Sequence, residues 1–454
     1  MFKKHQIYFL FFILIFLLII YRIFRIPSDP FVFIYNFIIL LYSLVGLMLM
    51  PYRYYSLTKV VYFFIFFFFG IIPLNDELKN NVYWNFKPLN VDAYQDANFL
   101  ILFGLIFFSL GNLVTIKKID YFDNLSNSNF KLSTKFYFLS FITLSLVSYL
   151  ILKDSDFNIL RLLTRDTPLE LLKEDYTSQY NSISTSIFFD TFIKPFPILF
   201  LLIYNFHYQS LKIKTIFSKI FLITLFFLSL ILVSPTSLSR FMVAALYIPF
   251  IIHFSNLWNK PYRLQFSLLI SVFFIFPLLN LFRYFNSEEF NLDIIKHFDF
   301  TFLDSGNFDA YQNFARTINQ DFITFGSQLS VVFLFFIPRS IWPSKPYGSG
   351  STLAEINGQS FGNISMPYMA EGYVNFGFLG VALFMFILGV ILNSLDYKFW
   401  NNKTEKSTPF TVYYSMLIGL IFFIMRGDLL SSFTYTVGLT ISFIVTLKIF
   451  KFLT

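Results

Sequence analysis

Long apolar runs, separated by short polar segments, dominate the chain. About 20 apolar residues cross the hydrocarbon core of a bilayer, and runs of this length predict about twelve membrane helices, near 6–21, 31–50, 57–73, 97–116, 134–152, 187–206, 216–234, 241–256, 264–282, 372–395, 409–425 and 429–450. The run at 329–337 is too short to cross. Because Gly326 and Pro338 flank it, we interpret it as a re-entrant segment, and a tilted full span from about Phe322 is the alternative.

This pattern predicts an all-α polytopic integral membrane protein in three parts. A nine-span region covers 1–282, a long loop with the re-entrant segment covers 283–371, and a three-span region covers 372–454. Lys3-Lys4 and the first apolar run resemble a signal peptide, but no small-residue cleavage site follows. We therefore expect this run to stay as the first membrane helix.

Composition agrees with the membrane interpretation and limits the chemistry. The 454 residues are 56% hydrophobic and 13% charged, whereas soluble domains are about 25% charged. Cysteine is absent, and the four histidines show no metal-ligand spacing, so we expect no disulfide, no metal and no cofactor. No phosphate-binding glycine loop, hydrolase elbow or metalloprotease motif occurs, and nothing indicates a nucleic-acid partner.

Charge asymmetry predicts the orientation, because cytoplasmic loops are rich in Lys and Arg. With the N-terminus inside, the inner loops hold 18 basic and 4 acidic residues, a balance of +14. The outer segments hold the other 16 basic and 22 acidic residues, a balance of −6, and the two sum to the formal charge of +8. Both termini are then cytoplasmic and the loop 283–371 is extracytoplasmic.

Arginine is distributed against this bias. Sixteen of 23 Lys fall inside, but nine of 11 Arg fall outside: Arg22, Arg25, Arg161, Arg165, Arg240, Arg283, Arg316, Arg339 and Arg426. The guanidinium group suits bidentate recognition of phosphate and carboxylate. Arg240, Arg283 and Arg426 lie at outer ends of predicted spans, and Arg339 follows the re-entrant run. They could converge on one anionic group, or each could reach lipid phosphate or a loop carboxylate.

The stretch 337–377 is the least membrane-like part of the chain. Prolines and glycines at this density exclude a regular helix, and irregular backbone at membrane depth must lie in protein or line a wet cavity. Arg339 and Lys345 lie here, and Glu371 stands at the mouth of the following apolar run. Before this stretch, the loop 283–328 alternates carboxylates with aromatic residues. That pattern suits a sugar, and an ordinary folded segment is the alternative.

These features match a lipid-linked diphosphate sugar, which has a greasy tail, a diphosphate at the headgroup plane and a glycan in water. Cations would meet the diphosphate at bilayer depth, and the acidic and aromatic loop would meet the glycan. The residues alone leave glycosyl transfer and lipid transport both open.

Two motifs resemble those of a known family. Pro-Arg-Ser-Ile-Trp-Pro-Ser-Lys-Pro at 338–346 and Ala-Glu-Gly-Tyr-Val-Asn-Phe-Gly at 370–377 are similar to segments of the bacterial oligosaccharide repeat unit polymerases, the Wzy type of O-antigen and capsule assembly. The resemblance implies the metal-independent C-type glycosyltransferase fold shared with O-antigen ligases. The resemblance assigns places in the site to Arg339, Lys345 and Glu371, and less closely to Arg240. Arg283 and Arg426 are added from topology alone.

The implied activity joins undecaprenyl-diphosphate-linked repeat units into O-antigen, capsule or exopolysaccharide, on the outer face of the bacterial inner membrane. Expected partners are the lipid-linked oligosaccharide, the bilayer and a chain-length regulator protein. Arginines would stabilise charge on the leaving diphosphate, and Glu371 would accept the acceptor hydroxyl's proton. Alternatively Glu371 pairs with an arginine and only shapes the site. A lipid-linked oligosaccharide flippase and an O-antigen ligase remain the alternative functions.

Overall fold

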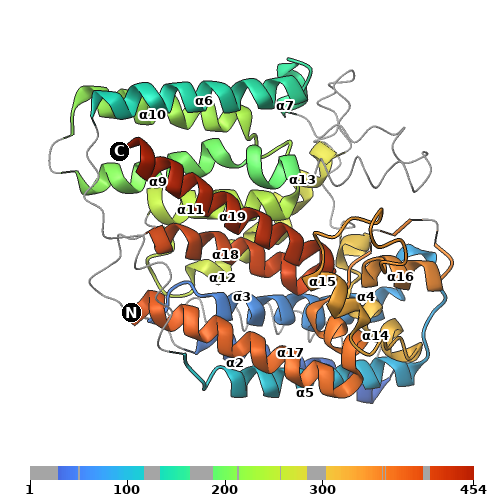
Figure 1. Ribbon diagram of the computed structural model, residues 1–454. Coiled ribbons are helices and arrows are strands. Elements are labelled where there is room, and N and C mark those ends of the chain that lie inside the picture. The colour runs from blue at the N-terminus through green and yellow to red at the C-terminus, as the bar shows by residue number, and fades with distance from the viewer. Residues whose placement is uncertain are drawn as a thin grey trace, which may run out of the picture.

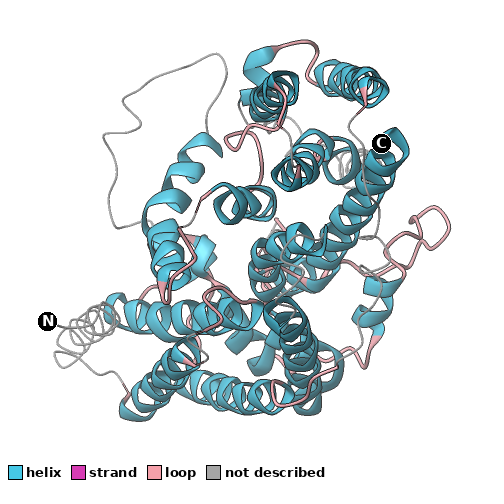
Figure 2. Ribbon diagram, turned by 90° about the vertical axis from the view of Figure 1, so that its left-hand side faces the viewer, coloured by secondary structure: helices cyan, strands magenta, loops and turns pink. Residues whose placement is uncertain are grey.

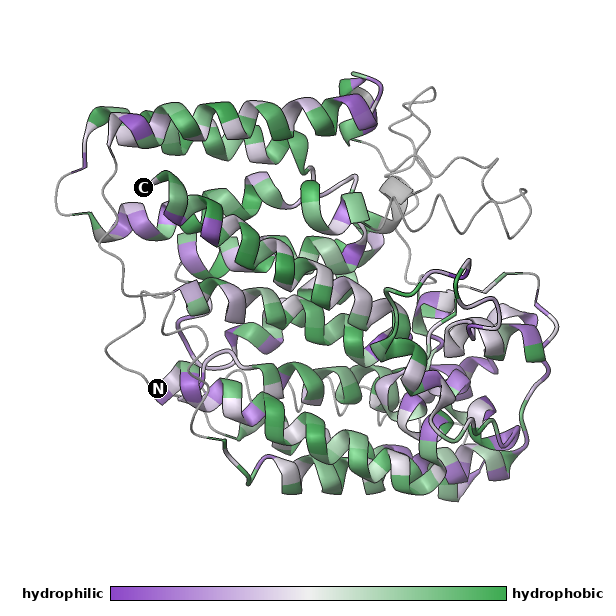
Figure 3. Cartoon of the chain, viewed as in Figure 1, coloured by the Kyte–Doolittle hydropathy of each residue, from purple (hydrophilic) through white to green (hydrophobic). Residues whose placement is uncertain are grey.

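The computed structural model describes residues 29–49, 52–116, 133–163, 188–211, 214–255, 257–283, 303–359, 361–362, 364–401 and 409–454. Over these residues the chain is helical, and no strand occurs among them. The long helices lie side by side as one bundle (Figure 1), and Figure 2 looks along their axes. Hydrophobic residues cover the helices, while hydrophilic ones gather around α14 and α16 and at helix ends (Figure 3).

Eight helices of the described chain are long and apolar enough to cross a membrane. They are α2 (Pro30–Met48), α3 (Leu57–Phe64) continued by η1 (Ile65–Ile71) and α4 (Ile72–Lys79), α5 (Val91–Gly111), α6 (Thr134–Asp154), η5 (Phe189–Ile193) with α9 (Phe196–Ser210), α17 (Tyr368–Asn401), α18 (Pro409–Arg426) and α19 (Leu429–Leu453). The prediction of an all-α polytopic membrane protein is confirmed at this level.

Three other predicted spans form shorter apolar helices: α10 (Ile216–Leu232), α11 (Arg240–Phe254), and α12 (Arg263–Ile270) continued by η6 (Ser271–Ile275) and α13 (Phe276–Arg283). The predicted span 6–21 and the part of the long loop at 284–302 lie outside the described residues. The total of twelve and the glycosyltransferase fold stay predictions.

Burial differs greatly between the inner and the outer helices. In α3 and η1 nearly every side chain is buried, including Phe63, Phe64 and Phe67. The peripheral α6 instead exposes Phe138 and Phe141, as expected of a surface that faces lipid. Because lipid tails are as apolar as phenylalanine, close packing rather than the hydrophobic effect holds such helices together.

Helix α17 contains a sharp break that the sequence did not indicate. Phe376 and Gly377 leave helical geometry, and Gly377 has a φ of 59° and a ψ of −143°, which only glycine adopts readily. Residues 368–375 therefore form an arm that folds back on the following helix, so that Gly372 meets the backbone of Gly380. The predicted span 372–395 is continuous only after this break.

The predicted long loop is largely folded where it is described. It forms η9 (Gly306–Phe308), α14 (Ala310–Asn319), α15 (Ser327–Phe333) and α16 (Ser349–Ile356). These elements lie at one end of the bundle, where α18 ends and α19 begins, and the C-terminus lies at the other end (Figure 1). The seven residues of α15 rise about 10 Å, too little to cross a bilayer, and the re-entrant path of 329–337 stays a prediction.

Candidate functional site

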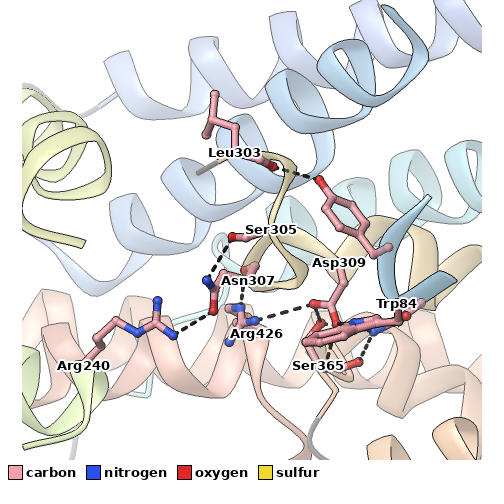
Figure 4. Close-up of polar contacts among 10 residues, drawn as sticks. Trp84, Arg240, Leu303, Ser305, Asn307, Asp309, Ser365 and Arg426 are labelled. Atoms are coloured by element: carbon pink, nitrogen blue, oxygen red, sulfur yellow. Dashed lines mark hydrogen bonds and ion pairs between the residues drawn. The ribbon is translucent and has the colours of Figure 1, made fainter. Parts of the chain in front are cut away.

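Two of the predicted arginines meet at one residue between α11 and α18. Arg240 begins α11 and Arg426 ends α18, two helices that pack along each other. Asn307 in η9 lies between them (Figure 4). Its side-chain oxygen accepts a hydrogen bond from Arg240 Nη2 at 2.8 Å, and its backbone carbonyl accepts one from Arg426 Nε at 2.9 Å. The two cationic groups are therefore held near each other by a single residue.

The position of Arg240 is unfavourable for its own helix. A helix N-terminus carries partial positive charge, so a cation there does not stabilise α11. The guanidinium instead lies 3.9 Å from the centroid of the Phe276 ring, a cation–π contact between α11 and α13. We conclude that packing with its neighbours, and not helix stability, sets the place of Arg240.

Asp309 is the buried acid of this cluster, with no exposed surface. Its carboxylate accepts hydrogen bonds from Trp84 Nε1 at 2.7 Å, Asn313 Nδ2 at 2.9 Å, and the backbone N–H and hydroxyl of Ser365. Arg426 Nη2 lies 3.5 Å from it. A buried carboxylate needs such donors. Asp309 thus links Arg426 to α14 and to η2 (Tyr83–Asn85), which holds Trp84 (Figure 4).

Glu371 is buried, at 2% exposure. The hydrogen bonds to its carboxylate come from Ser349 and Leu429 and not from an arginine. Its Oε1 atom accepts two hydrogen bonds, one from the Ser349 hydroxyl and one from the backbone N–H of Leu429 at 2.7 Å. Asp428 lies beside it and acts on it electrostatically. Asp428 accepts a hydrogen bond from Ser431 N–H at 2.7 Å. The first N–H groups of a helix have no partner within the helix. The two acids accept hydrogen bonds from such groups and together cap the N-terminus of α19.

Burial raises the pKa of Asp428, although its side chain retains some exposed surface. Gly348 packs against this carboxylate, so that a Cβ there would lie 1.9 Å from Asp428 Oδ2. Two neighbouring carboxylates in a poorly hydrated place favour holding a proton. The pair is therefore able to take up or release one.

The cations of the proline-rich stretch bind their own loop. Arg339 donates to the backbone carbonyls of Lys345 and Pro346, and its guanidinium lies 4.0 Å from the Tyr347 ring centroid. Lys345 Nζ donates to the carbonyls of Phe335 and Ile337 at 2.8 and 2.9 Å, and burial lowers its pKa. These bonds close the loop after α15. Binding of a diphosphate by Arg339 and Lys345 stays a prediction.

Arg283 is the last residue of α13, and its side chain lies outside the described residues. The acidic and aromatic segment falls largely in the core where it is described. Phe308 and Tyr311 are buried, and Asp304 pairs with Lys79 at 2.7 Å. This arrangement agrees with the alternative of a folded segment. Its remaining acids and rings before residue 303 lie outside the described residues.

Sequence reasoning missed Asn307 and Asp428. Asn307 carries no motif, and its role depends on two helices far from it in the chain. Asp428 had a signal, since Met-Arg-Gly-Asp ends at this residue between two spans. The described residues contain no group of three or more His, Asp or Glu side chains that could hold a metal ion.

No family model, no curated protein and no solved structure matches this chain. The resemblance to the repeat unit polymerases therefore stays an expectation from the motifs at 338–346 and 370–377.

Proposed function

We propose that the protein is a glycosyltransferase that polymerises lipid-linked oligosaccharide repeat units at the outer end of the membrane bundle. The observation that carries this proposal is the meeting of Arg240 and Arg426 on Asn307, close to the α19 N-terminus that Glu371 and Asp428 cap. Paired guanidinium groups suit a diphosphate, and nearby carboxylates suit proton transfer.

In the proposed reaction, a hydroxyl oxygen of the acceptor sugar forms a bond to the anomeric carbon of the donor. The bond from that carbon to the diphosphate breaks, and the diphosphate leaves with the electron pair. Arg240 and Arg426 stabilise the negative charge that develops on the diphosphate. Electrostatic stabilisation of this kind is usually the largest contribution to the rate enhancement. The acceptor hydroxyl's proton goes to the carboxylate pair, in which Asp428 is partly exposed and Glu371 is buried.

The proposed substrate is an undecaprenyl-diphosphate-linked repeat unit, and the product is O-antigen, capsule or exopolysaccharide. Its support is the resemblance of the two motifs together with a site at the end of a multi-pass membrane bundle. The proposed location is the bacterial inner membrane with the site facing outward. We also propose a chain-length regulator protein as a partner, from the resemblance alone.

Deletion of the protein, followed by glycan profiling, tests the proposal. Loss of a polymerase leaves single repeat units at the surface, whereas loss of a flippase leaves none. Loss of a ligase leaves polymer that has not been transferred to its final acceptor. Only the first profile agrees with the proposed function.

A further inference from the structure

Helix α14 is amphipathic, but its polar face is buried as well as its apolar one. Gln312 donates to Asp76 Oδ2 at 3.1 Å and to the Asn81 carbonyl at 2.8 Å, and accepts from Tyr83 N–H at 3.2 Å. Thr317 donates to the Asn313 carbonyl at 2.7 Å. Buried polar groups are normally hydrogen-bonded in this way.

Arg316, on the same helix, is an exception. Its side chain is 2% exposed, and its guanidinium lies 4.5 Å from the centroid of the Phe86 ring. Within the part of the chain that the structure describes, Nε and Nη2 of Arg316 have no hydrogen-bond acceptor. Asp76 accepts hydrogen bonds from Gln312 and from Tyr83 Oη, the latter at 2.7 Å.

The two unpaired nitrogens lie on one edge of the guanidinium group. Their N–H bonds point in parallel, which is the fork that takes both oxygens of a carboxylate or phosphate. A guanidinium stays charged in a protein, so burial without an acceptor is unfavourable. The Phe86 ring compensates for part of this through its face, but it leaves the edge unused.

Aromatic side chains lie near Arg316. Tyr94 acts electrostatically on Arg316 and stacks on Tyr311 with ring centroids 5.8 Å apart. Tyr94 is partly exposed, whereas Phe86 is buried. Rings of this kind pack on the C–H surfaces of sugars. Arg316 lies seven residues, or about 10 Å along the helix, from Asp309, so its edge is separate from the Arg240 and Arg426 pair.

We propose that the Nε and Nη2 edge of Arg316 is a binding site for a single oxyanion, a carboxylate or phosphate group carried on a sugar. Because Arg316 is 2% exposed, neighbouring side chains have to move to admit the ligand. Two sources supply this chemistry, an acidic sugar and a phosphorylated sugar, for which inorganic phosphate is the probe. The site depends on the unpaired edge of Arg316 and not on the proposed polymerase reaction, so either proposal can fail without the other.

Thermal unfolding of the purified full-length protein tests the site with three probes: glucuronate, inorganic phosphate and the neutral sugar glucose. We expect the unfolding midpoint of the wild type to rise with glucuronate or phosphate and not with glucose, because ligands that bind the folded state stabilise it. A rise with glucuronate alone identifies an acidic sugar, and a rise with phosphate alone identifies a phosphate group. Either supports the site.

Arg316→Met should abolish the rise, and without ligand it should unfold at a higher temperature than the wild type because an unpaired buried charge is gone. Arg161→Met, which removes an exposed outer arginine paired with Asp156, is the matched control and should respond like the wild type. If Arg316→Met does not accumulate, Arg316→Lys replaces it and should bind at least 10-fold more weakly.

Two results would overturn the proposal. One is a wild-type protein whose midpoint responds to neither anion, in which case another part of the chain or water meets Arg316. The other is an Arg316 variant that responds as strongly as the wild type.

Discussion

The close crossing of Gly372 and Gly380 predicts that a single methyl group will displace the arm that carries Glu371. A Cβ at Gly380 would lie 1.9 Å from the Gly372 carbonyl oxygen and 2.8 Å from its carbonyl carbon. These are backbone atoms and cannot rotate away. Real Cβ contacts are at least 3.0 Å long, and the oxygen lies at 1.9 Å, so the arm and the following helix must separate by at least 1.1 Å.

A displacement of this size reaches the site, because Gly372 follows Glu371 directly. The bond between Glu371 and Leu429 N–H is 2.7 Å long and tolerates little lengthening. Misplacement by about 1 Å costs roughly 100-fold in rate. Forcing an extra methyl group into a packed interface costs about 1–3 kcal/mol, partly offset by about 1 kcal/mol of improved helix propensity. Gly380→Ala should therefore lose most polymerisation and unfold at a somewhat lower temperature.

Gly104→Ala is the matched control on the facing helix α5. The three atoms nearest to a Cβ there are side-chain atoms of Val381, Met369 and Met385, at 3.2–3.3 Å, and these can adjust. Both variants are compared in membranes for polymer length and in purified form for the unfolding midpoint. Equal polymerisation and equal unfolding midpoints of Gly380→Ala and Gly104→Ala would show that an added methyl group does not displace the arm.

Three further predictions concern single residues. Arg339→Lys should keep normal protein levels but lose about 100-fold in polymerisation rate, since one ammonium cannot replace a bidentate donor; a wild-type rate in a gel assay of chain length contradicts this. Burial raises the pKa of Asp428, so its contribution to stability is complete below its unfolded pKa of about 4 and is lost as pH rises through the folded value. Asp428→Asn, which keeps a capping side chain, should therefore unfold at a higher temperature than the wild type at pH 8, with a smaller pH dependence; an unchanged pH dependence refutes this. Glu355→Cys, at an exposed position of α16 in a chain without other cysteines, should react with impermeant thiol reagents only from outside, and labelling only from the cytoplasm would reverse the topology.

The membrane helices were predictable because a bilayer imposes a length and a composition on each span. Eleven of the predicted spans coincide with helices in the described residues. The break at Phe376 and Gly377 was not predictable, because an apolar run continues through it and glycine is common in membrane helices. The burial of α14 was also missed, since Gln312 hydrogen-bonds to partners more than 200 residues away.

The site was predictable in part. Arg240 and Arg426 were singled out by their place at the outer ends of spans, and the structure brings them together. The residue that joins them, Asn307, follows from packing alone. Arg339 and Lys345 were chosen because they lie in the motif at 338–346, but in the fold of the proline-rich stretch both side chains donate to backbone carbonyls. Charge patterns predict where cations lie, and only the fold decides what they bind.

Reconstitution of the reaction is the most direct test of the proposed function. Purified protein in liposomes is given undecaprenyl-diphosphate-linked repeat units in the presence of EDTA, and the products are separated by length. The wild type is predicted to make a ladder of polymers, and a variant with both Arg240→Gln and Arg426→Gln is predicted to leave single units although it inserts normally. Single units alone from the wild type, a strict need for added divalent metal, or a full ladder from the double variant would contradict the account.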